Sequence, residues 1–280
     1  MKDFKGKLVY ITGGSSGIGL SLARLLCARG ARILLCARNE KKLLAAKRDI
    51  EKSAGPAGGQ VMTLSLDVSS PRDVNTKMKR AVKEFGAPDI LVNSAGINTH
   101  ADRFENMTIE GLDEVMRTNV YGTWGVTRAL VGPMRERKGH VVILASAAGL
   151  FGMFGYTVYA ATKAALIGFA ESLRYELAPL GMRVTLVCPP EVDTPMNIDE
   201  AKTLPPEGRA VKDMAGFITP DFAARDIVKA LEKGSFLVIP CFTTRFLYLM
   251  HRLTNGWISR FVTDMVIRGV QKKKGSPLYV

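Results

Sequence analysis

Short runs of apolar, often β-branched residues alternate along the chain with longer segments in which apolar residues recur every three or four positions. The short runs have the length and composition of buried strands, and the longer segments have the period of helices. The pattern predicts helices at residues 18–29, 40–52, from 71 onward, 112–134 and around 159–163, and strands at residues 7–12, 31–37, 60–66, 89–96, 139–146, 183–189 and 236–240.

The predicted strands are apolar throughout, which is typical of strands that are covered on both faces by helices. Strands that alternate with helices are joined by right-handed crossovers and lie parallel to one another. We therefore expect an α/β fold with one doubly wound, mainly parallel sheet of about seven strands. Ligands of such sheets bind at the carboxyl ends of the strands, so residues there are the first candidates for function.

The pattern changes after residue 240. Apolar residues keep helical spacing through residues 242–253 and again through 257–266, on either side of the pair Asn255-Gly256, which predicts two amphipathic helices. Residues 241–280 hold seven basic residues and one acidic residue, Asp264, and the arginines interrupt the apolar residues too often for a membrane span. We expect residues 1–240 to form the main domain and residues 241–280 an extension. The extension either lies in the interface of an anionic membrane or packs on the fold or on a second subunit.

Composition narrows the classes of protein. A chain of 280 residues that is 47% hydrophobic can bury one sizeable core. The start of the chain lacks the apolar core of a secretory signal, and no run of about eighteen apolar residues is present, so we expect a cytoplasmic setting without an N-terminal anchor. The 4 cysteines and 3 histidines are scattered, so no metal site is expected.

The net charge of +13 admits a nucleic acid, an anionic cofactor or an anionic membrane as a partner. A nucleic acid is not expected, because no basic stripe with interleaved aromatic residues lies outside the C-terminal extension.

A glycine-rich turn, "TGGSSGIG" at residues 12–19, follows the first predicted strand and precedes the first predicted helix. Glycines there let the backbone turn tightly, approach a pyrophosphate and pack the helix on the sheet, while the helix N-terminus attracts the anion. A purely structural loop is the alternative, and the position between strand and helix favours a dinucleotide. The expected contacts with the cofactor are Gly13, Ser15, Ser16, Gly17, Ile18 and Gly19.

The end of the second strand bears on the choice of cofactor. A free ribose hydroxyl prefers an acidic residue there, whereas this chain has Arg38, whose guanidinium suits a 2′-phosphate. We therefore expect NADPH rather than NADH, with a surface arginine of no such role as the alternative. Asp67 and Val68 end the third strand and are expected near the adenine.

The segment "YAATK" places Tyr159 and Lys163 four residues apart in a predicted helix. Residues at that spacing share a helix face about 6 Å apart, so a phenol and an ammonium could act on one bound molecule. The pair also occurs in helices where the phenol is half buried and the lysine is solvated. The other motifs of the chain decide between these interpretations.

Together these motifs resemble those of the short-chain dehydrogenase/reductase superfamily. The resemblance covers residues 7–195 and rests on "TGGSSGIG", on "NSAG" at residues 93–96, on Asn119 in "TNVYG", on Ser146 in "ILASAAG", and on "YAATK". It implies a single Rossmann domain. It also implies further cofactor contacts at Asn93, Ala95, Gly96, Tyr159, Lys163, Pro189, Val192 and Thr194. Ser94 stands where the family often has asparagine, a departure in the structural framework around Asn93.

The resemblance implies a catalytic tetrad of Asn119, Ser146, Tyr159 and Lys163. Tyr159 would give a proton to a ketone oxygen while the nicotinamide delivers hydride to the carbon. Lys163 and the positive nicotinamide would lower the pKa of this phenol, and Lys163 would also hold the nicotinamide ribose. Ser146 would donate a hydrogen bond to the developing oxyanion, and Asn119 would keep a water that relays protons to the lysine.

The substrate is indicated by the loop after the sixth strand. The family usually has a proline-glycine pair there, whereas this chain has Pro190 in place of the glycine, within "CPPEVDTP". With "GLFGMFGYTVYAATK" and "LPPE", the loop resembles that of the 3-ketodihydrosphingosine reductases, which reduce the ketone of a long-chain sphingoid base with NADPH. Residues 190–217 would form a lid over the substrate. The apolar residues Leu150, Phe151, Met153 and Phe154 would contact an acyl chain or else pack against the lid.

Other functions remain open at the level of sequence. A short-chain reductase of this kind could act on a steroid, a retinoid or a 3-ketoacyl thioester. A nucleotide-sensing or nucleic-acid-binding protein without catalysis is the remaining class, and the intact tetrad argues against it. If the chain is a reductase of the 3-ketodihydrosphingosine type, we expect a long-chain ketone substrate and a homodimer or homotetramer. We also expect peripheral contact with the cytoplasmic face of a membrane, that of the endoplasmic reticulum in a eukaryote or the inner membrane in a bacterium.

Overall fold

The structure, a computed structural model, describes residues 3–274. Its centre is a seven-stranded parallel sheet with the order β3-β2-β1-β4-β5-β6-β9. The strands are β1 (Leu8–Thr12), β2 (Arg32–Ala37), β3 (Val61–Ser65), β4 (Ile90–Asn93), β5 (His140–Leu144), β6 (Arg183–Val187) and β9 (Leu237–Val238). Each lies within a run that the hydrophobic pattern predicts as a strand, and the predicted doubly wound α/β fold is confirmed.

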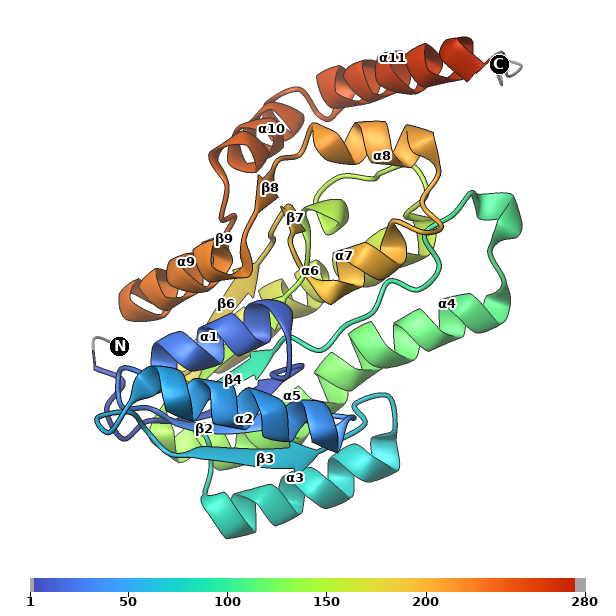
Figure 1. Ribbon diagram of the computed structural model, residues 1–280. Helices are drawn as coiled ribbons and strands as arrows, with labels where there is room; N and C mark the ends of the chain where they lie inside the picture. Colours follow the sequence, from blue (N-terminus) through green and yellow to red (C-terminus); the bar gives the residue numbers. More distant parts are fainter. Residues whose placement is uncertain (1–2, 275–280) are drawn as a thin grey trace.

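Helices cover both faces of this sheet (Figure 1). One apolar core lies between the sheet and α1 (Gly17–Cys27), α2 (Glu40–Ala54) and α9 (Pro220–Lys233). The second lies on the opposite face, under α3 (Pro71–Phe85), α5 (Gly122–Met134) and α6 (Thr157–Leu177). Burial on both faces explains why the apolar residues of these strands follow one another instead of alternating with polar ones.

The direction of chain winding reverses between β1 and β4, which are neighbours in the sheet although β2 and β3 come between them in sequence. A crevice opens at such a point beyond the carboxyl ends of the strands, because the flanking crossovers lead away from it on opposite sides. The glycine-rich turn follows β1 and the "NSAG" motif begins in the last residue of β4. The topology therefore brings these two motifs to one crevice.

The long helix predicted over residues 112–134 is present in three parts. A regular helix, α4 (Ile109–Met116), leads into a π-helical turn over Arg117–Tyr121 and then into α5. Single π turns widen a helix by one residue and often lie at functional sites. Here the turn contains Asn119, and short 3-10 turns elsewhere span Phe104–Asn106, Arg135–Arg137, Ala147–Gly149 and Ala178–Leu180.

Residues 190–217, here called the cap segment, lie over the carboxyl edge of the sheet. They contain β7 (Glu191–Val192), α7 (Pro195–Glu200) and α8 (Pro206–Asp213), and β7 pairs with β8 (Phe217–Ile218) in a small sheet of its own. Thr194, at the N-terminus of α7, approaches the glycine-rich turn: a Cβ on Gly17 would lie 3.0 Å from its methyl group.

Two helices follow β9, as the amphipathic pattern predicts: α10 (Phe242–Leu253) and α11 (Trp257–Lys274). In Figure 1 they lie at the outer side of the cap segment, and α11 packs along α8. The buried Thr244 hydroxyl also donates to the Ala215 carbonyl, at 2.6 Å. No helix among residues 3–274 is long and apolar enough to cross a membrane.

Candidate active site

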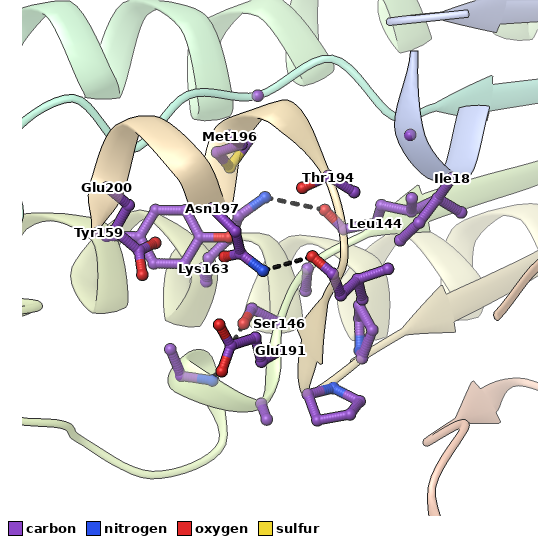
Figure 2. Close-up of a pocket in the computed structure, with 18 of the residues that line it drawn as sticks. Ile18, Leu144, Ser146, Tyr159, Lys163, Glu191, Thr194, Met196, Asn197 and Glu200 are labelled. Atoms are coloured by element: carbon purple, nitrogen blue, oxygen red, sulfur yellow. Dashed lines mark hydrogen bonds between the residues drawn. The ribbon is translucent and has the colours of Figure 1, made fainter. Parts of the chain in front are cut away.

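A cavity of about 190 Å³ lies where the cap segment covers the carboxyl edge of the sheet (Figure 2). Its floor is formed by the glycine-rich turn and by the segments that follow β4, β5 and β6. Its wall is the N-terminal part of α6, and its roof comes from the cap segment. Segments far apart in the sequence thus meet around one enclosed space, at the position expected for a ligand of a doubly wound sheet.

The glycine-rich turn is built for close approach. Gly13 has φ 67° and faces the "NSAG" segment so closely that a Cβ on it would lie 2.8 Å from the amide nitrogen of Ala95. A Cβ on Gly19 would lie 2.6 Å from the Gly13 carbonyl oxygen. The N-cap residue of α1, Ser16, makes no side-chain cap, so the first amides of this helix are left for an anionic ligand.

Thr12 joins the two motifs at the floor of the cavity, a role that we did not assign from the sequence. Its hydroxyl accepts hydrogen bonds from the backbone amides of Ser94 and Ala95, both at 3.2 Å. The end of β1 is thereby tied to the segment after β4. The threonine that opens the glycine-rich motif is the sequence feature that could have indicated this role.

Ser146, Tyr159 and Lys163 meet on one side of the cavity (Figure 2). Ser146 follows β5 and caps the short turn after it, with its hydroxyl accepting from the amide of Ala148 at 3.2 Å. Tyr159 and Lys163 lie on α6, and the Lys163 ammonium is 5.3 Å from the centroid of the Tyr159 ring and donates to the Leu144 carbonyl at 3.1 Å. The spacing of four residues places both groups on one helix face, as expected.

Asn119 lies directly behind this group. A Cβ on Gly96 would lie 3.3 Å from the Asn119 amide oxygen and 3.5 Å from the Lys163 ammonium, so both approach the same point. The Asn119 side chain is fully engaged by the protein: it accepts from the Ile97 amide at 2.8 Å and donates to the Ile97 carbonyl at 3.0 Å and the Thr162 hydroxyl at 3.1 Å. The four residues of the expected tetrad are therefore brought together, and the water-holding role of Asn119 remains a prediction.

Burial controls the protonation of the two titratable groups. Burial raises the pKa of Tyr159 above its usual range, the Glu200 carboxylate adds to the rise, and a hydrogen bond with Ser146 opposes it. Burial also lowers the pKa of Lys163 to about 8. In the chain by itself the pKa of Tyr159 thus moves opposite to the direction expected from Lys163, because desolvation of the phenolate outweighs an ammonium that is turned toward the Leu144 carbonyl.

Most of the residues expected to contact the cofactor line this cavity. Those that line it are Gly13, Ser16, Gly17, Ile18, Ala95, Gly96, Tyr159, Lys163, Pro189, Val192 and Thr194. Ser94, which departs from the family pattern, lines it as well. The predicted contacts Ser15, Gly19, Arg38, Asp67, Val68 and Asn93 lie outside the lining.

The residues outside the lining differ in character. Asn93 is buried and donates to the Thr127 hydroxyl at 3.0 Å, which suits a structural role. Asp67 accepts from the amide and hydroxyl of Ser69 at 3.0 and 2.7 Å. Arg38 is exposed just after β2, and no residue of the described part of the chain forms an ion pair with its guanidinium. Arg38 is thus free to meet an anionic group.

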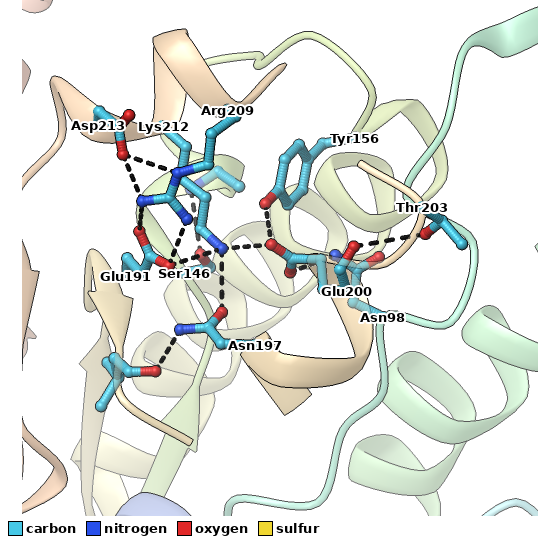
Figure 3. Close-up of polar contacts among 12 residues, drawn as sticks. Asn98, Ser146, Tyr156, Glu191, Asn197, Glu200, Thr203, Arg209, Lys212 and Asp213 are labelled. Atoms are coloured by element: carbon cyan, nitrogen blue, oxygen red, sulfur yellow. Dashed lines mark hydrogen bonds and ion pairs between the residues drawn. The ribbon is translucent and has the colours of Figure 1, made fainter. Parts of the chain in front are cut away.

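The sequence reasoning missed a polar cluster in the roof of the cavity (Figure 3). Glu200 on α7 is buried and accepts hydrogen bonds from the Tyr156 hydroxyl, the Lys212 ammonium and, at 2.8 Å, the Asn98 amide. Lys212 on α8 also donates to the Asn197 amide oxygen at 3.0 Å and lies 3.2 Å from a Glu191 carboxylate oxygen. No spacing along the chain pointed to these contacts, because they form between separate elements of the cap segment.

The apolar residues after Ser146 have different surroundings. Met153 lines the active-site cavity. Leu150 packs against the core under α6, and the Phe151 ring lies 6.0 Å from the His251 ring of α10. Phe154 lies beneath the Arg103 guanidinium, 5.4 Å from ring centroid to guanidinium carbon. Packing therefore accounts for Leu150 and Phe151, and Met153 alone faces the space beside Tyr159.

Comparison with known proteins agrees with this geometry. Residues 7–205 match the family described as short chain dehydrogenase. The chain is 39% identical over 233 residues to the 3-ketodihydrosphingosine reductase of Mus musculus, which covers 82% of this chain and 70% of that protein. It is 35% identical over 195 residues to the 3-oxoacyl-[acyl-carrier-protein] reductase of Escherichia coli (strain K12), covering 69% of this chain and 77% of that one.

The fold is also similar to that of solved structures. The crystal structure of levodione reductase superimposes with a TM-score of 0.76 at 27% sequence identity, over 84% of this chain and 96% of the other.

Proposed function

We propose that this chain, which belongs to the short chain dehydrogenase family, reduces the 3-keto group of 3-ketosphinganine with NADPH. The family consists of oxidoreductases that act on ketone and CH-OH groups. The observation that carries the choice of substrate is the extent of the similarity. The match to a 3-ketodihydrosphingosine reductase combines 39% identity with 82% of this chain, whereas ketoacyl reductases reach 35% identity over 69% of the chain or 31% over 85%.

The residues of the cavity fit reduction of a ketone. The Tyr159 hydroxyl, kept protonated by burial, donates its proton to the substrate oxygen, and Ser146 supplies a second hydrogen bond to that oxygen as negative charge develops. With a pKa of about 8, Lys163 is mostly charged near neutrality and stabilises the phenolate that remains. A nicotinamide cofactor, when bound, supplies the hydride.

The preference for NADPH rests on Arg38. The tight approach at Gly13 and the uncapped start of α1 fit the pyrophosphate of either nicotinamide dinucleotide. Arg38 follows β2, where the adenosine ribose of a dinucleotide lies in doubly wound folds, and its exposed, unpaired guanidinium suits a 2′-phosphate.

A second hollow of about 490 Å³ adjoins the active-site cavity. It lies between the segment around Phe154 and helix α11, and its lining is mixed, with the apolar Phe104 and Ile267 beside the charged or polar residues Arg103, Glu105, Asp264, Arg268 and Gln271. Met153 lines both this hollow and the active-site cavity. A hydrocarbon chain attached to a ketone beside Tyr159 would extend past the flexible side chain of Met153 into this second hollow.

The proposal predicts a ranking of substrates. With NADPH, the purified protein should reduce 3-ketosphinganine in mixed micelles with a kcat/KM at least about tenfold above that for a 3-ketoacyl thioester, a steroid ketone or a retinoid of matched concentration. Consumption of NADPH and mass spectrometry of the product measure this ranking. A thioester or steroid at the head of the ranking would replace the proposed substrate while leaving the reductase assignment intact.

We also propose that the exposed face of α10 and α11 lies on an anionic membrane surface, on the cytoplasmic side. Large apolar side chains there are exposed although the opposite face of the helices packs on the cap segment: Phe242, Phe246, Leu249, Leu253, Trp257, Phe261 and Met265. The basic residues Arg245, Arg252, Arg260, Arg268 and Lys272 are exposed among them. Apolar residues with arginines between them suit an interfacial helix beside anionic head groups.

Replacing Trp257 and Phe261 together with serine should lower binding to anionic vesicles at least about tenfold, because each buried large apolar side chain is worth about 1.5–3 kcal/mol. These two rings stack on each other, and they are 67% and 59% exposed, so the folded chain should tolerate their loss. Co-sedimentation with phosphatidylserine vesicles at low and high salt measures the effect. Tyr175→Ser, at an equally exposed tyrosine on α6, is the control. Intact chain that never sediments, or a change of oligomeric state in the double variant, would assign this face to a subunit contact.

A further inference from the structure

We infer that Glu200, with Glu191 and Asn197 beside it, forms a binding site for the primary ammonium group of an α-amino ketone. The inference rests on the proposed function and adds to it the means by which the substrate is distinguished from other long-chain ketones. The site lies in the cap segment, in the roof of the cavity that holds Tyr159.

The chain itself shows that this site binds an ammonium group. The Lys212 ammonium contacts three oxygen acceptors: a Glu200 carboxylate oxygen, the Asn197 amide oxygen at 3.0 Å and a Glu191 carboxylate oxygen at 3.2 Å (Figure 3). Three acceptors around one nitrogen match the three donors of a primary ammonium. The Lys212 side chain therefore stands in for an alkylammonium ligand.

The site is buried and oriented by its surroundings. Glu200 is 4% exposed, and its two carboxylate oxygens are held by the Tyr156 hydroxyl and, at 2.8 Å, by the Asn98 amide. A carboxylate held in this way keeps its position when a cation on its other side is exchanged. A buried carboxylate also requires a cation or several donors, so the site selects for positive charge.

The position of Glu200 near Tyr159 suits a substrate with an amine on the carbon next to the carbonyl. Glu200, Ser146 and Tyr159 line the same cavity, and the Glu200 charge is close enough to raise the pKa of Tyr159. In an α-amino ketone the nitrogen lies two bonds from the carbonyl carbon. A ketone oxygen at Tyr159 therefore leaves the nitrogen only a short distance from the roof, on the side where Glu200 lies.

The cluster can accept one further cation. It holds one carboxylate more than it holds cations, its charged members being Glu191, Glu200, Asp213, Arg209 and Lys212. Arg209 binds both oxygens of Glu191, at 2.9 and 2.8 Å, and also pairs with the exposed Asp213. Lys212 can therefore withdraw toward Glu191 while a substrate ammonium takes its place at Glu200, since neither charge is then left unpaired.

The test compares 3-ketosphinganine with the same ketone lacking its 2-amino group, in identical micelles. The wild-type protein should prefer the amino ketone, and Glu200→Gln should lower kcat/KM for the amino ketone about 10- to 100-fold, the loss expected for one charge-assisted hydrogen bond. The same variant should change kcat/KM for the deaminated ketone by no more than a few fold. Glutamine keeps the size of the side chain; its amide oxygen can accept from the Asn98 amide, and its amide nitrogen can donate to the Tyr156 hydroxyl oxygen.

Lys212→Met separates this role from a purely structural one. If Glu200 only fastened the cap segment through Lys212, both variants would break the same ion pair and would lower turnover of both ketones alike. Removal of a competing ammonium should instead preserve or increase the preference for the amino ketone. The ratio in Lys212→Met decides the matter alone if thermal unfolding shows that Glu200→Gln does not fold.

Two failures are distinguishable. Turnover of 3-ketosphinganine without preference for the amine, or an equal loss for both ketones in Glu200→Gln, overturns the ammonium site and leaves the proposed function standing. No turnover of 3-ketosphinganine by a wild-type protein that reduces other ketones overturns the proposed function, and the ammonium site with it.

Discussion

Replacing Tyr159 with phenylalanine is expected to lower kcat about 10³-fold, within the range that a positioned general acid contributes, while the affinity for NADPH stays within a few fold. The substitution removes one oxygen from a partly buried ring and should leave the helix and its packing unchanged. The side chain lies in the cavity between Ser146 and Lys163, and no other phenol is so placed, since the Tyr156 hydroxyl donates to Glu200. No other tyrosine hydroxyl among the described residues is therefore placed to donate the proton that the ketone oxygen receives from Tyr159.

Single-turnover kinetics and cofactor titration measure the two quantities separately. Tyr10→Phe is the control for loss of a phenolic hydroxyl, because Tyr10 is a fully buried tyrosine that lies in β1 and donates to the Gly86 carbonyl at 2.8 Å, outside the lining of the cavity. It should cost about 1 kcal/mol of stability and leave kcat unchanged. A Tyr159→Phe protein with more than a tenth of the wild-type kcat would remove Tyr159 from the role of proton donor.

The fold could be predicted from the sequence because its signals are local. Seven apolar runs marked the strands, and burial on both faces followed from the absence of alternation within them. The sequence predicted the site at the carboxyl ends of the strands, and the observed strand order places it at the ends of β1 and β4. The division of the helix over residues 109–134 by a π turn could not be predicted in this way. One extra residue in a turn leaves the hydrophobic period almost unchanged, and the turn is held by the tertiary contacts of Asn119 with Ile97 and Thr162.

The residues of the candidate site likewise differ in whether a local sequence pattern indicates them. Tyr159 and Lys163 lie at a helical spacing, and the glycine-rich turn lies between a strand and a helix, so each has a local reason to be noticed. Glu200 and Lys212 have none. They lie on separate short helices of the cap segment, and only the packing of those helices over the cavity brings their charges together. From the sequence alone, Glu200 and Lys212 are each indistinguishable from a charged residue on a solvent-exposed helix face.

The C-terminal helices pack on the fold through one side, which is one of the alternatives that the sequence left open, and leave their other side exposed. Their period predicts one apolar stripe, and the structure divides the apolar residues between two faces. Tyr248 packs against the core under α6, whereas Phe242 and Trp257 are exposed. An amphipathic pattern cannot say what covers its apolar face. A helix that packs on the protein through one side and keeps large apolar residues on the other needs both a fold and a further surface.

Replacing Arg38 with aspartate is expected to lower kcat/KM with NADPH about 100-fold and to change kcat/KM with NADH by no more than a few fold. One charge-assisted hydrogen bond to a phosphate is worth about 1.5–3 kcal/mol, and the introduced carboxylate adds repulsion to the loss. NADH has no 2′-phosphate to repel, and a carboxylate at this position can accept a hydrogen bond from its ribose hydroxyl. The substitution should therefore reverse or abolish the preference between the cofactors instead of inactivating the protein.

Arg48→Asp is the control for the change in net charge, because Arg48 is exposed on the neighbouring helix α2 and its side chain bonds only the Leu44 carbonyl among the described residues. If long-range attraction of an anionic cofactor were the cause, both variants would weaken NADPH equally and both effects would fade with added salt. A direct contact predicts a loss confined to Arg38→Asp. Equal losses with NADPH and NADH in that variant would show that Arg38 supports the loop after β2 instead of reading the cofactor, and the proposal of NADPH would then lose its basis in this chain.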